Sequence, residues 1–309
     1  MHRRFWNNFA YYRYYFFILL FISIVLNRFI LENQDNYFVL YILCTILLGI
    51  GFYNSPIWVI FLLTFLVVTC RFFFLPEPSA SFSTFIIYLF TYLLITFISV
   101  AFMSRVQRVL EDNLALTKVL SNALDSRDSY TMHHSKNVAK YAMKIAEKMK
   151  LPHYLCEVIH IGGLLHDIGK IGIPEHILTK PGKLTEQEYK LIKTHATKGF
   201  EIIKHVRHYK NSGILDIVLY HHERFDGKGY PKGLKGEEIP LVARIVAVAD
   251  SFDAMSSKRV YRKELQLENI LQEIKDNKGK QFDPVVVDAF LALFAKEFHK
   301  ENGNCKSLC

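Results

Sequence analysis

The segment LLHDIGKIGIPEHIL, residues 164–178, contains the feature that decides the fold. An apolar run leads into the polar pair His166–Asp167, and Gly169, Gly172 and Pro174 follow directly. Glycine and proline mark the ends of helices and the turns between them. The segment therefore predicts a helix that ends at two polar side chains.

The same alternation of helical runs and breakers extends over the second half of the chain. Apolar residues at helical spacing fill residues 138–149, 184–203, 241–255 and 284–298. No alternating pattern typical of a strand competes with them. We therefore expect an all-α bundle of about seven helices over residues 125–299, followed by a flexible tail at 300–309.

Residues 1–103 are almost entirely apolar and aromatic. A helix needs about 20 mostly apolar residues to cross a bilayer, with a range of about 17–25. Four runs qualify, which predicts four transmembrane helices rather than four buried helices of a soluble protein. These runs are residues 11–31, 37–53, 57–75 and 82–103.

The basic residues that flank these runs predict their orientation. Arg3, Arg4 and Arg13 precede or begin the first run, and Arg105 and Arg108 follow the fourth. Positive charge favours the cytoplasmic side of a membrane. We expect a multi-pass membrane protein with both termini and the helical domain in the cytoplasm.

Residues 104–124 form the predicted linker between the two parts. Residues 102–123 contain neither proline nor glycine, and their apolar positions recur at alternating spacings of four and three. This is the seam of a short parallel coiled coil, although an amphipathic helix packed on its own domain would show a similar pattern. The seam positions are Phe102, Val106, Val109, Asn113, Leu116, Leu120 and Ala123.

The net charge of +9 comes largely from scattered lysines, with no basic stripe interleaved with aromatic residues. This argues against nucleic acid as a partner and favours a surface that faces anionic lipid. The five cysteines form no disulfide framework. CKSLC at the C-terminus could hold a metal, but a disordered tail is the preferred interpretation.

Histidine and aspartate gather in the helical domain beyond what a core normally holds. Asp250 lies within the apolar run 241–255, where a buried carboxylate needs a compensating charge. Adjacent donors such as His166–Asp167 and His221–His222 suit two metal ions side by side, a usual device for phosphoester hydrolysis. Hydrogen-bonded core histidines remain the alternative from these residues alone.

HDIGK at 166–170 together with HHERFDGKGYP at 221–231 resembles the HD-GYP family of HD phosphohydrolases. The resemblance extends from LDSRDSYTMHHSKNVAKYA, at 124–142, to KGKQFDPVVVDAFL, at 278–291. It implies a membrane-bound bacterial phosphodiesterase that hydrolyses cyclic di-GMP to the linear dinucleotide or to GMP.

The resemblance also implies the ligands of two divalent metal ions, Fe or Mn or else Zn, with Asp167 bridging them. Tyr130 stands where some relatives have a glutamate for a third metal, and His133 stands where the family often has glycine. The implied ligands are His134, His166, Asp167, His195, His221, His222 and Asp250.

Beyond the metals, the resemblance implies a role for Lys170 at the scissile phosphate or the leaving group. It further implies substrate contacts from Arg259 and Arg262, and from Gly227 and Tyr230 in a loop that could also meet diguanylate cyclases. Two alternatives remain open. One is the same chemistry on another nucleotide, and the other is a receptor or scaffold that binds without turnover.

Overall fold

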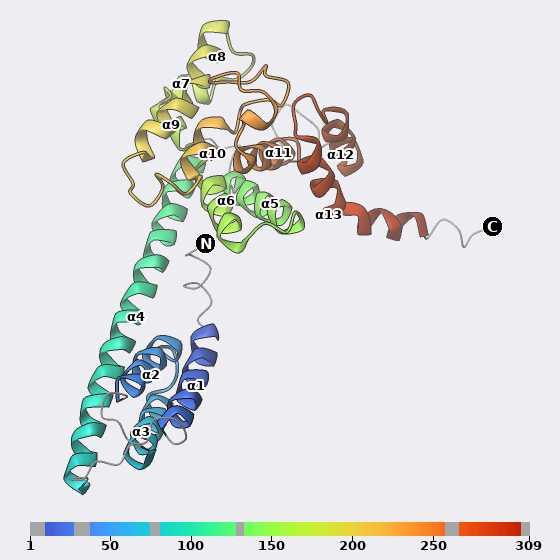
Figure 1. The fold of residues 1–309 in the computed structure, drawn as a ribbon. Helices are drawn as coiled ribbons and strands as arrows, with labels where there is room; N and C mark the ends of the chain where they lie inside the picture. The colour runs from blue at the N-terminus through green and yellow to red at the C-terminus, as the bar shows by residue number, and fades with distance from the viewer. Residues whose placement is uncertain (1–9, 28–37, 75–80, 128–132, 257–265, 304–309) are drawn as a thin grey trace. The chain divides into compact units, whose positions relative to one another are not determined.

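The structure, a computed structural model, describes residues 10–27, 38–74, 81–127, 133–256 and 266–303. The chain divides into two compact units, residues 1–113 and 114–309. Among the described residues, the only β-type pairing is an isolated bridge between Lys278 and Phe282. The all-α prediction is therefore confirmed (Figure 1).

The first unit contains α1 (Ala10–Val25), α2 (Phe38–Gly51), α3 (Ile57–Phe74) and the first part of α4 (Phe82–Asp125). Helix α2 packs against both α1 and α3. Large side chains such as Phe16, Tyr41 and Tyr92 are buried among these helices. Many other apolar side chains point outward, including Phe73, which is 71% exposed, and Phe90, which is also 71% exposed.

Two of these helices, α3 and α4, are long and apolar enough to cross a membrane. The described parts of α1 and α2 are 16 and 14 residues long and fall below that length. The predicted runs 11–31 and 37–53 both extend into residues 28–37, which lie outside the described part of the chain. Four transmembrane spans therefore stay a prediction.

Helix α4 continues for 44 residues through the fourth apolar run and the whole predicted linker. The boundary between the two units falls within it, after Asn113. Near its end, Thr117, Ser121 and Leu124 are buried in the second unit. The predicted seam lies on a different face, where Leu116 is 61% exposed. Residues 117–124 of the linker thus pack on the second unit through one face, whereas the seam residues Leu116, Leu120 and Ala123 are exposed.

The second unit is built from nine α-helices after α4, within its described residues, where the sequence predicted about seven. The run 184–203 is two helices, because the backbone turns at Thr194, whose hydroxyl donates to the Leu191 carbonyl at 2.6 Å. The helices are α5 (His134–Lys148), α6 (His153–Leu165), α7 (Glu175–Leu178), α8 (Glu186–Lys193), α9 (His195–Ile203), α10 (Ile214–Tyr220), α11 (Leu241–Ser256), α12 (Leu267–Asp276) and α13 (Pro284–Gly303).

Two 3-10 helices, η3 (Ile168–Gly172) and η4 (Gly236–Glu238), complete the unit. Helix α11 lies at its centre and contacts α5, α6, α10, α12 and α13. Its apolar sequence follows from that position, since Ile245, Val246 and Val248 are fully buried. Burying such a residue contributes about 1.5–3 kcal/mol, so the core holds α11 firmly in place.

Gly169 allows η3 to lie directly against α9. A Cβ atom at this position would come within 1.8 Å of the His195 carbonyl oxygen and 2.4 Å of the Gly199 nitrogen. Both are backbone atoms of α9, which cannot move without displacing the helix. This contact fixes His166, Asp167 and Lys170 on one side beside His195 on the other.

We expect Gly169→Ala to lower the free energy of unfolding of the second unit by about 3 kcal/mol, the upper end for overpacking. Gly172→Ala is the matched control, because its Cβ would meet only the flexible side chain of Lys198, at 3.0 Å. Urea unfolding of the full-length chain, followed by circular dichroism, measures both. Equal stability of the two variants would contradict the close contact.

Candidate metal centre

The ends of several helices converge on one buried cluster of donor atoms. His134 begins α5, His166 and Asp167 follow α6, and His195 begins α9. His221 and His222 follow α10. Asp250 differs, since it projects from within α11. All seven predicted ligands are brought together in this way.

The donor atoms fall into two groups, each within 4.8 Å. One contains His134, His166 and Asp250, and the other contains Asp167, His195, His221 and His222. His221 and His222 lie in the same group. From the sequence, we expected one of these two histidines to bind each metal ion.

Asp167 lies between the two groups. Its Oδ1 is 3.3 Å from His195 Nε2, and its Oδ2 is 3.2 Å from His166 Nε2. Its two oxygens therefore face different groups, as the predicted bridging role requires. Lys170 donates to Asp167 Oδ2 at 2.6 Å.

The other ring nitrogens anchor the imidazoles to the protein. His166 Nδ1 lies 2.7 Å from the Gly163 carbonyl oxygen, and His195 Nδ1 lies 2.8 Å from that of Ile192. His221 Nδ1 has the Ile217 and Val218 carbonyls at 3.1 Å. Carbonyl oxygens only accept hydrogen bonds, so each Nδ1 carries a proton and each Nε2 is the nitrogen that faces the cluster. This is the arrangement of metal-binding histidines.

Asp253 supports His134 in the same way, with its Oδ2 accepting a hydrogen bond from Nδ1 at 2.7 Å. Sequence reasoning missed this residue. Its spacing from Asp250 was a usable signal, because residues three apart share a face of a helix.

The protonation of the cluster follows from burial and charge. Burial and the charge of His195 lower the pKa of His222 to about 3, and burial and the charge of His222 hold that of His221 well below its usual value. Both rings are neutral at pH 7, as a metal ligand must be. Burial also acts to lower the pKa of His134, but hydrogen bonds to Asp250 and Asp253 outweigh it and raise the pKa to about 10.

The donor set fits divalent metal ions. His166 Nε2 is buried and has no hydrogen-bond partner among the described residues, although Asp167 Oδ2 is nearby. An unpaired buried nitrogen is costly unless something binds it. Five imidazoles with two carboxylates match Fe, Mn or Zn better than Ca.

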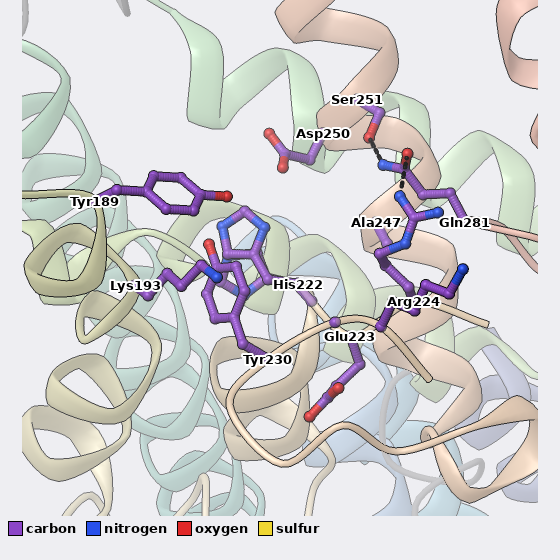
Figure 2. Close-up of a pocket in the computed structure, with 13 residues that line it drawn as sticks. Tyr189, Lys193, His222, Glu223, Arg224, Tyr230, Ala247, Asp250, Ser251 and Gln281 are labelled. Carbon is purple, nitrogen blue, oxygen red and sulfur yellow. Dashed lines mark hydrogen bonds between the residues drawn. The ribbon is translucent and has the colours of Figure 1, made fainter. Parts of the chain in front are cut away.

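A cavity of about 280 Å³ opens beside the cluster (Figure 2). His222 and Asp250 form its base, with Tyr189, Lys193 and Tyr230 along one wall (Figure 2). The Tyr230 ring stacks on His222 with centroids 4.8 Å apart.

The opposite wall is a hydrogen-bonded polar chain. Arg224 donates to Gln281 Oε1 at 3.1 Å, and Gln281 donates to the Ser251 hydroxyl at 3.4 Å. Three polar side chains are thereby held in place at the cavity.

The loop after His222 is held by the buried carboxylate of Glu223. This group accepts hydrogen bonds from the backbone N–H groups of Lys232, Gly233 and Leu234 at 2.7–3.1 Å. Gly229 is required as well, because a Cβ there would lie 2.3 Å from the Arg224 nitrogen. The sequence indicated a glycine loop here but not the carboxylate that holds it.

The predicted substrate residues divide into three kinds. Tyr230 lines the cavity. Gly227 has a positive φ of 80° and is not among the residues that line the cavity, so its contact with substrate stays a prediction. Arg259, Arg262 and the metal-related position Tyr130 lie outside the described residues.

Comparison with known proteins agrees with this geometry. The family model for the HD domain matches residues 118–286. The chain is 46% identical over 180 residues to a cyclic di-GMP phosphodiesterase of Thermotoga maritima, covering 57% of this chain and 48% of that protein.

Two further relatives show the range of names among similar proteins. The cyclic di-GMP phosphodiesterase response regulator RpfG of Xanthomonas campestris is 43% identical, covering 56% of this chain and 46% of that protein. The 3'3'-cGAMP-specific phosphodiesterase 2 of Vibrio cholerae is 37% identical, covering 59% and 35%.

The chain thus spans about half or less of the length of each relative. The family model nevertheless covers more than half of this chain, and the HDIGK and HHERFDGKGYP segments supply four of the seven clustered donors. The chain therefore belongs to the HD domain family, in its HD-GYP branch.

Proposed function

We propose that the chain is a metal-dependent phosphodiesterase that hydrolyses cyclic di-GMP to the linear dinucleotide or to GMP. The observation that carries this proposal is the pair of buried donor groups at the base of an open cavity. Two of the three relatives described above are named as cyclic di-GMP phosphodiesterases. Every predicted donor is in place, which argues against a receptor that has lost turnover.

Two divalent ions held by the two groups would lower the pKa of a water nucleophile and neutralise charge on the scissile phosphate. The protein's own groups prepare the site for this reaction. Asp167 turns one oxygen toward each donor group. Lys170 keeps its ammonium against Asp167, where it can donate to a phosphate oxygen or to the leaving ribose oxygen.

The cavity walls suit a nucleotide. Tyr189 and Tyr230 offer aromatic faces on which a base can stack. Lys193 lies between them, 4.6 Å from the Tyr189 ring centroid and 5.2 Å from that of Tyr230, where its charge can meet a phosphate. Arg224 and Gln281 add hydrogen-bonding groups that can read a base edge.

A second cyclic dinucleotide is the other candidate substrate. The Vibrio cholerae relative is named as specific for 3'3'-cGAMP, and a metal centre recognises phosphates rather than bases. The choice between the two substrates therefore depends on the cavity walls.

We also propose that the first unit anchors the enzyme in the bacterial cell membrane. Helices α3 and α4 have the length and composition of transmembrane helices, and only a third of the apolar window in α3 and 11% of that in α4 are buried. Apolar surface on this scale favours lipid contact. The arginine distribution favours a cytoplasmic catalytic unit.

The exposed seam on α4 suits a second copy of the same chain. Phe102, Val109, Leu116 and Leu120 are 50–63% exposed, at the spacing of a coiled coil. We propose a parallel homodimer through residues 102–123.

The loop that contains exposed Lys228 is the proposed contact for a diguanylate cyclase.

The metal-dependent reaction is tested with the full-length chain purified anaerobically in detergent. We expect about two Fe or Mn ions per chain and hydrolysis of cyclic di-GMP in preference to 3'3'-cGAMP and cyclic di-AMP. In a variant with His166→Ala and Asp167→Ala, both the bound metal and turnover should be lost. Elemental analysis measures the bound metal, and chromatography of the products measures turnover.

The control is His205→Ala, which removes an exposed histidine outside the cluster. Bound metal with no turnover of any cyclic dinucleotide would reject the proposed reaction. Preferential turnover of 3'3'-cGAMP would identify the second candidate substrate.

For the membrane anchor, we expect the chain to stay in the membrane fraction after alkaline carbonate extraction. A reporter enzyme that is active only in the cytoplasm should be active when fused after residue 309. Release of the chain by carbonate, or an inactive but intact fusion, would contradict the anchor or its orientation.

For the dimer, Leu116→Lys together with Leu120→Lys places two like charges in the seam. We expect the purified chain to shift from dimer to monomer in light scattering. The control pair Lys118→Glu and Lys136→Glu alters exposed residues off the seam and should leave the mass unchanged. A wild-type chain that is monomeric at all concentrations would rule the dimer out.

A further inference from the structure

The end of α4 contacts two segments that adjoin donor residues, namely the start of α5 beside His134 and η3 beside Asp167. Asp125 is the last residue of α4, and Arg127 lies two residues after it. Neither residue belongs to the donor cluster or lines the cavity. Each nevertheless makes several hydrogen bonds to a segment adjoining a donor.

Asp125 holds the start of α5. Its carboxylate is buried and accepts two hydrogen bonds from Ser135, from the hydroxyl at 2.7 Å and from the backbone N–H at 3.3 Å. The first N–H groups of a helix have no partner within the helix. His133, the N-cap residue of α5, provides no side-chain cap. The carboxylate of Asp125, at the end of α4, therefore caps the start of α5 next to His134.

Arg127 holds η3. Its guanidinium donates to the carbonyl oxygens of Lys170, Ile171 and Ile173 at 3.0–3.4 Å, and it forms an ion pair with Glu175 at 3.4 Å. These carbonyls belong to the turn that directly follows Asp167. The planar fork of arginine suits several fixed acceptors at once. Lysine, with a single nitrogen, could not reach all three.

We propose that Asp125 and Arg127 are positioning residues of the metal centre, through which the end of α4 sets the places of His134 and Lys170. This inference rests on the proposed function. A ligand held within a few tenths of an ångström binds metal more tightly than a loosely held one. Loss of an outer hydrogen-bond partner lowers metal affinity by about 10–100-fold in comparable sites.

Manganese titration of the full-length, metal-stripped chain tests the Asp125 contact, with free Mn²⁺ followed by electron paramagnetic resonance. Wild type should bind two ions. Asp125→Asn should weaken one of them about tenfold and leave the other unchanged, and Ser135→Ala should do the same. The double variant should be no weaker than either single variant, since both remove one interaction.

The matched control is Asp112→Asn, an exposed aspartate on the same helix, which should bind both ions as wild type does. Unchanged affinity in Asp125→Asn, equal weakening of both ions, or additive losses in the double variant would overturn the inference. A wild-type chain that binds no metal would instead overturn the proposed function, and the inference with it.

Arg127→Ala tests the second contact, with Arg207→Ala as the control at an exposed arginine. We expect Arg127→Ala to keep both Mn²⁺ ions, because the contact adjoins Lys170, but to lower kcat for the cyclic dinucleotide by about tenfold or more. Equal kcat in the two variants, or loss of bound Mn²⁺ in Arg127→Ala, would overturn the positioning role.

Discussion

The second unit is organised around the need to hold seven donor groups in one buried volume. Such a cluster is unfavourable by itself, because buried polar groups must find partners and buried charges must be compensated. The structure meets part of this need with hydrogen bonds from Nδ1 of His134, His166, His195 and His221. A bound cation would meet the rest. The positions of the surrounding helices are consistent with this demand, since nearly every donor lies at a helix end.

Placing donors at helix ends explains why glycine recurs around the site. A helix end reaches a shared centre only if neighbouring backbones approach closely, and side chains would prevent that. Gly169 lets η3 touch α9, and Gly229 lets the loop fold over Glu223 and Arg224. His133 adopts a left-handed backbone conformation with a φ of 72°, although it is not a glycine. The left-handed conformation there gives a reason for the glycine that the family often has.

Much of this arrangement could be predicted from the sequence, and the rest could not, for identifiable reasons. The helical class follows from apolar periodicity, and the seven donors follow from motifs in which each residue type is chemically required. Asp125 and Asp253 were missed because their partners lie on another helix, and Glu223 was missed because its partners are backbone N–H groups of the following loop. Thr194 was missed because a break between two helices needs neither proline nor glycine. Residues that act by holding a neighbouring residue in place carry no sequence motif of their own.

The uninterrupted α4 has a consequence for how chains of this kind can vary in length. Each residue added to a helix rotates everything after it by about 100° and moves it about 1.5 Å along the axis. Asp125 and Arg127 meet their partners only in one rotational phase relative to the buried face formed by Thr117 and Ser121. A residue inserted between Ser121 and Asp125 would therefore turn and displace both contacts away from α5 and η3, even if the helix itself stayed intact.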